Sequence, residues 1–252
     1  MRTIRSVAAA AALTVVTGCS VYEDFTTSDF AQQDGDAIVA AASETMREVT
    51  SLRVTGQVRE GGEQYFVDLR MDREDRCKGT LRVGGSHIDI RRIGDRAWLK
   101  GEPGAFNRLG GGSVPRQVLD RLSRSWLQLD DRTVTRLCDF DALLAEFEVV
   151  DFGQRRNGKN ASGKGRTEDA VVDGPVPATV VEETSLDGRK AVELSASPGG
   201  AHEERTWVLS EAPHHVVRME STSTRDGGTI SFSEFDVEVE VEAPPAEDVI
   251  RP

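Results

Sequence analysis

The side chains most able to do chemistry do not form a recognisable catalytic arrangement. The nucleophile motif Gly-x-Ser-x-Gly is absent from the sequence. His214 and His215 are adjacent in a predicted strand, so their side chains point to opposite faces and cannot easily share a metal ion. The run from Gly158 to Lys164 imitates the start of a P-loop, but Gly165 stands where the metal-binding Ser or Thr belongs. We therefore predict no enzyme activity, no cofactor and no metal site.

The first of the three cysteines has the clearest chemistry, because it follows a secretion signal. Arg2 and Arg5 form a basic segment, and Val7 to Val16 is apolar. The run Val16-Thr17-Gly18-Cys19 then resembles the lipobox of bacterial lipoproteins. This resemblance implies lipid attachment to the Cys19 thiol, cleavage after residue 18 and acylation of the new amino group. A transmembrane helix, which needs about 20 apolar residues, and a plain signal peptide are the alternatives.

The other two cysteines, Cys77 and Cys138, remain once Cys19 carries lipid. Because an oxidising exterior favours pairing, we predict a disulfide between them. Two buried free thiols are the alternative. The sequence has no Cys-x-x-Cys motif, which excludes a zinc knuckle and a dithiol redox motif.

Charge and length limit the partners. The chain of 252 residues carries 31 Lys and Arg against 43 Asp and Glu, for a net charge of −12, which becomes −14 when Arg2 and Arg5 leave with the signal. Such a surface repels phosphate backbones, so we expect no nucleic-acid partner. We expect a monomer, anchored to the extracytoplasmic face of a bacterial membrane through Cys19. The scarcity of lysine relative to arginine suggests an actinobacterial source.

Three stretches are predicted from composition and period. Residues 1–18 are the signal, and the polar segment 19–35 is predicted to be a flexible tether. A single domain follows over 36–252, beginning with an amphipathic helix over 36–50 that Asp34 or Asp36 would cap. Within the domain, the Gly-rich basic stretch 153–174 is predicted to be a mobile loop. This loop is either simply solvated or in contact with anionic lipid headgroups.

Alternating apolar residues predict an antiparallel sheet with two helices in the middle of the chain. Five strands fall between residues 52 and 100, joined by short turns. A helix beginning at Pro115 would carry Val118, Leu119, Leu122 and Trp126 on one face, and a second would follow Asp139 or Asp141. Further strands follow between residues 180 and 241. In the last of these, the alternation changes phase, which predicts a bulge near Ser233 and Glu234.

This order of elements resembles the LolA/LppX-type carriers. The resemblance covers residues 36–250 and includes a Trp-Val-Leu-Ser strand ending near a Pro, a Phe-Ser-Glu-Phe run and an Ala-Pro-Pro-Ala tail. It implies an α+β fold, in which a curved antiparallel sheet forms an incomplete, half-open β-barrel with helices on its concave face. Proteins of this type hold acyl chains or lipids there, and related RseB-type sensors regulate a protein partner.

The apolar face of the sheet is the predicted binding site. If the helices leave a gap over a curved sheet, the gap would take a lipid or another hydrophobic ligand. Trp98 and Trp207 would report its binding by a change in emission. A ligand-free envelope scaffold or sensor, with a solid core and an envelope protein partner, is the alternative. The candidate pocket residues are Val67, Leu69, Ile88, Ile90, Trp98, Trp126, Trp207, Met219 and Phe232.

Overall fold

A computed structural model describes residues 27–109, 111–129, 138–148, 177–197 and 202–251. Cys19, the signal and the predicted basic loop 153–174 lie outside these residues. Within them, no helix is long and apolar enough to cross a membrane.

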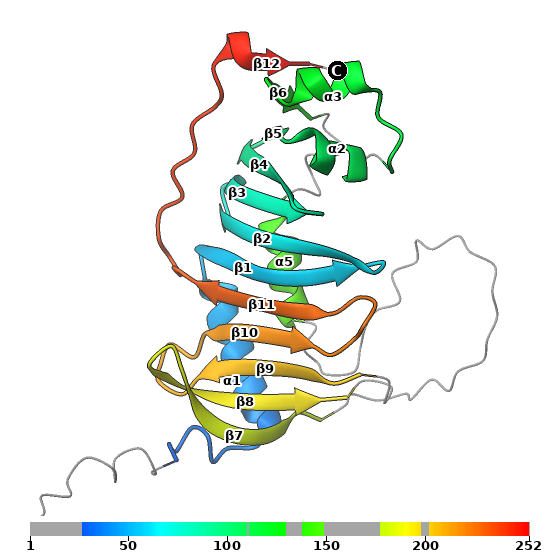
Figure 1. Ribbon diagram of the computed structural model, residues 1–252. Helices are drawn as coiled ribbons and strands as arrows, with labels where there is room; N and C mark the ends of the chain where they lie inside the picture. The colour runs from blue at the N-terminus through cyan, green and yellow to red at the C-terminus, as the bar shows by residue number, and fades with distance from the viewer. Residues whose placement is uncertain (1–26, 110, 130–137, 149–176, 198–201, 252) are drawn as a thin grey trace, which may run out of the picture.

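The described chain forms a twelve-stranded sheet that does not close into a barrel (Figure 1), which confirms the predicted α+β class and incomplete barrel. Its order is β12-β6-β5-β4-β3-β2-β1-β11-β10-β9-β8-β7, and the only parallel pair in this sheet is β12 with β6. The strands are β1 (Ser51–Glu60), β2 (Glu63–Asp72), β3 (Arg76–Val83), β4 (Ser86–Ile93), β5 (Arg96–Gly101), β6 (Trp126–Gln128), β7 (Thr179–Leu186), β8 (Arg189–Ala196), β9 (Glu204–Leu209), β10 (Val216–Ser221), β11 (Gly228–Ser233) and β12 (Val249–Ile250).

Two-residue turns join β1 to β2, β3 to β4, β4 to β5 and β7 to β8, as the sequence predicts. Asp187 and Gly188 both have positive φ angles, 52° and 78°, which a two-residue hairpin turn of the favoured hand requires. The hairpins give two local groups of strands, β1 to β5 and β7 to β11. The two groups are joined in the middle of the sheet, where β1 pairs with β11.

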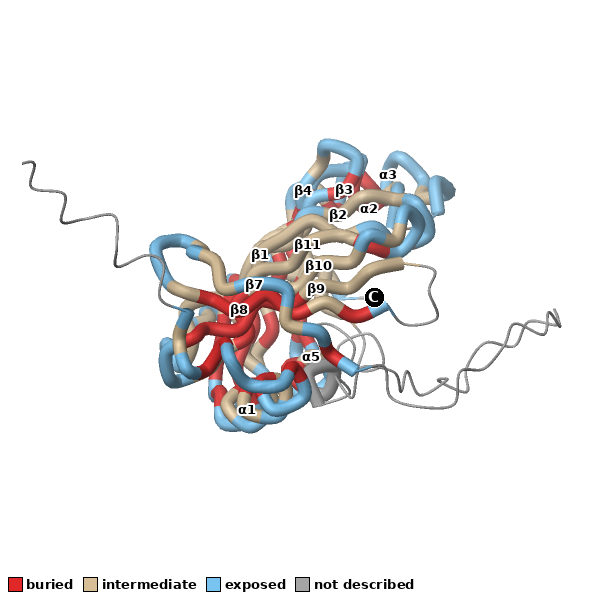
Figure 2. The backbone as a smooth tube through the Cα atoms, turned by 90° about the horizontal axis from the view of Figure 1, so that it is seen from below, coloured by how far each residue is buried: buried red, intermediate tan, exposed pale blue. Residues whose placement is uncertain are grey.

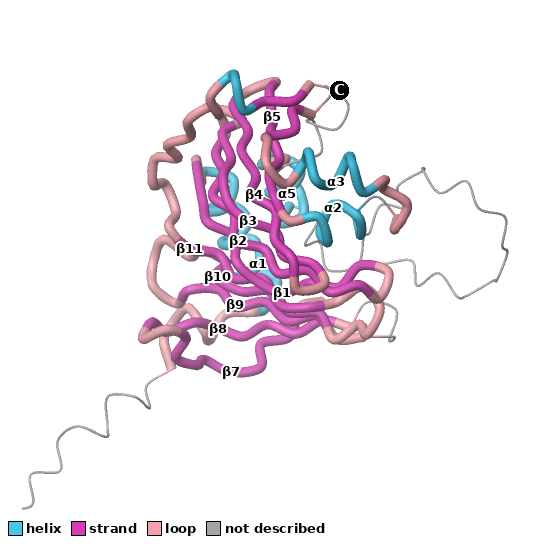
Figure 3. Tube along the Cα trace, turned by 45° about the horizontal axis from the view of Figure 1, so that its top comes forward, coloured by secondary structure: helices cyan, strands magenta, loops and turns pink. Residues whose placement is uncertain are grey.

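Helices lie on one side of the sheet. α1 (Gly35–Glu48) runs behind β11 to β7, and α5 (Phe140–Glu148) lies behind the middle strands. The short α2 (Pro103–Leu109) and α3 (Arg116–Leu122) lie together at the β5 end of the sheet (Figures 1 and 3). α1 buries Ile38, Ala42 and Met46, which recur every four residues and so share one face. This is the amphipathic helix that the sequence predicts. Asp34 occupies its N-cap position without a side-chain hydrogen bond to the helix.

Two predictions for the middle of the chain are wrong. Helix α3 ends at Leu122, so Trp126 lies in strand β6 instead, and Val118 is exposed rather than in line with Leu119. A further helix, α2, lies in the Gly-rich stretch after residue 101. The sequence did not predict it, because glycine disfavours helix formation. Its Ala105 and Phe106 are buried, which explains why a short helix is stable there.

Part of the predicted tether packs on the domain instead, because residues from Ser28 onward contact it. The hydroxyl of Ser28 donates a hydrogen bond of 2.6 Å to Glu183 in β7. Phe30 is buried and stacks on the ring of His214, with the ring centroids 3.7 Å apart. Because the composition of this segment is polar, sequence reasoning did not predict that Phe30 would be buried against the domain.

The predicted strand and bulge after residue 233 are also wrong. β11 ends at Ser233, and Glu234 and Asp236 adopt positive φ angles of 51° and 59°. The chain then runs along the ends of the strands to the far edge of the sheet as a segment that we call the strap (residues 236–248), which ends in a short 3-10 helix, η3 (Ala246–Asp248) (Figure 1). There β12 pairs with β6. Shifts in register lie instead in β10, between Val216 and Arg218, and in β7, between Val180 and Glu182.

Cys77 and Cys138 form the predicted disulfide, with their Cα atoms 6.1 Å apart. It connects β3 to the residue two positions before the start of α5. The guanidinium of the buried Arg92 donates a hydrogen bond of 3.0 Å to the Cys138 carbonyl. The Asp139 carboxylate accepts one of 2.9 Å from the amide of Ala142, which is the cap that the sequence predicts. The start of α5 is therefore fixed covalently and by two hydrogen bonds.

Candidate functional site

The strand register divides the sheet into two faces of different chemistry. Residues that pair across strands share a face, and neighbours along a strand alternate. One face carries Val54, Leu69, Ile90 and Phe232, which belong to the main core together with α1, α2, α3 and α5. We call this the helix-covered face. The other we call the open face.

A row of apolar side chains on the helix-covered face is covered only in part. The register aligns Leu81, Val67, Gly56, Ile230 and Met219 across β3, β2, β1, β11 and β10. All four side chains in this row are half-buried and border the core, whereas the residues beyond both ends, Ile88 and Thr206, are buried. Figure 2 shows this intermediate burial along the middle strands. We call these five residues the apolar row.

Gly56 leaves the centre of the apolar row without a side chain. A Cβ atom built there would lie 2.2 Å from the carbonyl oxygen of Thr229 in β11, so no other residue fits without moving the backbone. The half-buried side chains of Val67 and Ile230 therefore flank a gap in the row. With Leu81 and Met219, they form a row of half-buried apolar side chains on four strands, interrupted at β1, that could bind an apolar molecule.

Six of the nine predicted pocket residues lie on the helix-covered face. Ile88, Ile90 and Phe232 are buried in the core, whereas Val67, Leu69 and Met219 are half-buried at its border. Sequence reasoning left Leu99 and Leu127 out of this face. They pair with each other in β5 and β6, and Leu99 also pairs with Ile90. The alternation of Ala97, Leu99 and Gly101 along β5 indicates that Leu99 lies on the helix-covered face.

The three tryptophans lie on the open face, which corrects their predicted place in the pocket. Trp98 pairs with Arg91, and Trp207 pairs with Arg218. Each of these pairs is adjacent in its strands to a pair on the helix-covered face, so its side chains point to the opposite face. Trp126 belongs to the same face, because its strand neighbour Leu127 is the residue that pairs with Leu99. The predicted change of tryptophan emission on ligand binding therefore has no structural basis.

Cations cover these tryptophans. The guanidinium of Arg91 lies 4.6 Å from the ring of Trp126, that of Arg96 5.6 Å from Trp98, and that of Arg218 5.8 Å from Trp207. Cation–π contact and the aliphatic stems of these side chains bury each ring on a face that helices do not cover. Trp207 also belongs to a small second core with Leu209, Val217 and Ala191.

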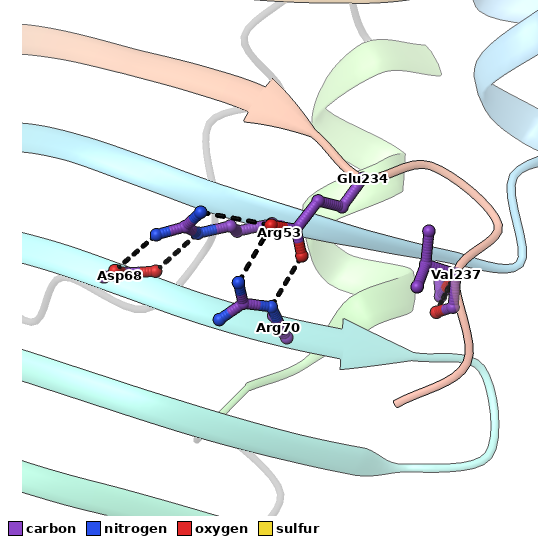
Figure 4. Close-up of polar contacts among 6 residues, drawn as sticks. Arg53, Asp68, Arg70, Glu234 and Val237 are labelled. Atoms are coloured by element: carbon purple, nitrogen blue, oxygen red, sulfur yellow. Dashed lines mark hydrogen bonds and ion pairs between the residues drawn. The ribbon is translucent and has the colours of Figure 1, made fainter. Parts of the chain in front are cut away.

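A polar cluster on the open face holds the point where the strap leaves β11 (Figure 4). Glu234 accepts hydrogen bonds of 2.6 Å from Nε of Arg70 and 3.1 Å from Nη1 of Arg53. Arg53 also makes two bonds of 2.8 Å to Asp68. These guanidinium bonds hold the pKa of Glu234 below its ordinary value of 4.5, Arg70 having the largest effect.

Neutralising Glu234 is expected to lower stability only where the carboxylate is charged. A lowered pKa in the folded state stabilises the fold above pH 4.5, and this contribution is lost as the pH falls through the folded-state pKa. Because Glu234 is about one-third exposed, we expect Glu234→Gln to cost only about 1 kcal/mol at pH 7. Urea denaturation at pH 7 and pH 3 checks this. A difference of the same size at both pH values would contradict the prediction.

The histidines do not assemble a metal or catalytic site. His214 stacks on Phe30, whereas His215 stacks on Phe235 with centroids 4.0 Å apart, so the two rings face different partners. Burial lowers the pKa of His215 below its ordinary 6.5, which favours the neutral ring at pH 7. Among the described residues, no group of three or more His, Cys, Asp or Glu could hold a metal ion.

Comparison with solved structures defines the fold. LprF from Mycobacterium bovis superposes with a TM-score of 0.53 at 13% sequence identity, over 83% of this chain and 96% of that one. This chain has a LolA/LppX-like fold. The lipoprotein LppX of Mycobacterium tuberculosis gives a TM-score of 0.49 at 11% identity, over 82% of this chain and 99% of that one. No protein-family model and no curated protein matches the sequence. The superposition on LprF shows a shared fold.

Proposed function

We propose that this chain is a membrane-anchored extracytoplasmic lipoprotein that binds or carries a lipid or another hydrophobic molecule on the helix-covered face. The observation that carries the proposal is the apolar row, whose four side chains are only half-buried although they border the core. An apolar surface of this kind is costly to leave in water, and ligand sites are mostly apolar. The LolA/LppX-like fold and the resemblance found in the sequence support the same function.

A charge placed in the apolar row is expected to abolish binding. Val67→Glu puts a carboxylate beside Leu81, and burying that carboxylate under an acyl chain should weaken binding of parinaric acid, a fluorescent fatty acid, at least about ten-fold. The matched control is Phe66→Glu, because Phe66 is the next residue in β2, is 40% exposed and points to the open face. Titration of both variants and the wild type with parinaric acid measures the effect.

Two results would contradict the proposal. One is a wild-type chain that does not bind parinaric acid, which would favour a scaffold acting through protein contacts. The other is an equal loss of affinity in both variants. Because Val67→Glu could also disturb the core, Met219→Gln at the other end of the row and near-UV circular dichroism separate lost binding from lost folding.

Anchoring through Cys19 is the second part of the proposal. The lipobox-like run is its support, since Cys19 lies outside the described residues. Cys19→Ala removes the thiol that would be lipidated, so we expect the variant to lose incorporation of labelled fatty acid and to leave the membrane fraction. A variant that still partitions with membranes like the wild type would exclude this anchor.

A further inference from the structure

Two exposed aliphatic side chains lie close together in the chain, on the pair of short helices at the β5 end of the sheet. Leu109 at the end of α2 is 48% exposed, and Val118 in α3 is 45% exposed. The same helices bury Phe106 and Leu119 in the main core, so Leu109 and Val118 are not needed for their packing on the domain. Among the described residues, only three other large apolar side chains are exposed: Phe66, Val181 and Val237.

Three arginines lie on α3 and in the turn that follows it. Arg116, Arg121 and Arg124 are exposed, and none of them makes an ion pair with a carboxylate among the described residues. Arg121 is three residues from Val118, so the two are neighbours on the surface of α3. In a chain with a net charge of −12, this is a local excess of positive charge next to exposed aliphatic groups. We call Leu109, Val118, Arg116, Arg121 and Arg124 the α2–α3 patch.

We propose that the α2–α3 patch is a docking surface for an anionic lipid bilayer. Arginines can reach phosphate headgroups while their aliphatic stems lie along the acyl boundary. Leu109 and Val118 would enter that boundary, as the apolar residues of interfacial helices do. The acidic remainder of the molecule is repelled by an anionic surface, so the α2–α3 patch would set the orientation of the domain on the bilayer.

The size of the α2–α3 patch favours a bilayer over a protein partner. A stable protein interface buries about 800 Å² on each partner, which two aliphatic side chains and three arginines cannot supply. A weak bilayer contact suffices when the molecule is already held near the surface, because the high local concentration of lipid adds to its strength. The inference does not require that the apolar row bind a ligand, so the two can fail independently.

Site-specific labels test the inference on the full-length chain. Cys19→Ser leaves Cys77 and Cys138 in their disulfide, so a cysteine introduced at Val118 is the single free thiol. The Cys19→Ser chain is tethered through an amino-terminal histidine tag to vesicles of equal parts phosphatidylglycerol and phosphatidylcholine that carry a trace of nickel-chelating lipid, which replaces the missing anchor. We expect a nitrobenzoxadiazole label at Val118→Cys to shift to the blue on these vesicles. The matched control is Val181→Cys, because Val181 is 52% exposed in β7 at the opposite edge of the sheet, and its label should not shift.

Charge reversal completes the test. Arg116→Glu with Arg121→Glu should weaken the Val118 response about thirty-fold or more, since each basic residue near an anionic surface contributes about five-fold. Arg189→Glu with Arg225→Glu changes net charge equally on other exposed arginines and should have little effect. The inference is overturned if the Val118 label stays in water, if the Val181 label responds equally, or if phosphatidylcholine alone gives the full response.

Discussion

Replacing both Cys77 and Cys138 with alanine is expected to lower the free energy of unfolding by about 4 kcal/mol, because the bridge spans 61 positions and restricts the unfolded chain. The folded state also loses a covalent link between β3 and the start of α5. The hydrogen bond from Arg92 to the Cys138 carbonyl can persist in the variant, because it is made to the backbone. We therefore expect a folded but much less stable protein.

Urea denaturation of the wild type and the double variant measures this loss. Cys19→Ala is the control, because Cys19 is not part of the bridge and its removal should leave the denaturation midpoint unchanged. Intact-mass measurement after alkylation tests the bridge itself. Two alkylated thiols among Cys77 and Cys138 in the folded, unreduced protein would contradict it, as would a double variant as stable as the wild type.

Ile38→Ala in α1 is expected to cost about 3 kcal/mol, within the range of roughly 2 to 5 for removing a buried isoleucine side chain. Ile38 has no exposed surface and lies in the main core with Phe30 and Met46. Truncation leaves a cavity that the neighbouring helix and sheet cannot fully close. The loss should appear as a lower midpoint of urea denaturation with an unchanged slope.

Val39→Ala provides the comparison within the same helix. Val39 is half-buried beside Ile38, and alanine is the better helix former, so this variant should lose much less stability. Equal losses at the two positions would mean that α1 does not pack on the sheet through the Ile38 face.

Sequence period alone predicted the five-strand meander, the amphipathic helix α1 and the apolar face, because each depends on local alternation. The tryptophans were misplaced because large aromatic rings were expected inside, although Arg96, Trp98 and Lys100 already showed the two-residue period of a polar face. The guanidinium cover that buries Trp98 is a tertiary contact. Strict attention to phase, rather than to residue size, would have placed this ring correctly.

Other features could not be predicted, because they depend on pairing between distant parts of the chain. Nothing local to Val249 shows that it will pair with Trp126 in β6. The positive φ of Glu234, which ends β11 and starts the strap, is held by Arg53 and Arg70 from strands more than 160 residues away. The half-burial of the apolar row likewise depends on where the helices come to lie.

The pairing of β1 with β11 has a consequence for how the molecule is made. Strands β1 to β5 can form from successive hairpins as soon as they emerge, because each pairs with its neighbour in the chain. The second edge of β1, however, has no partner until β11 is made, because Val54 pairs there with Phe232. A chain synthesised from its N-terminus therefore spends most of its synthesis with one edge of β1 unpaired beside exposed apolar side chains. The strand that ends this exposure, β11, is made near the end, so the period of greatest risk of aggregation lasts until synthesis is nearly complete.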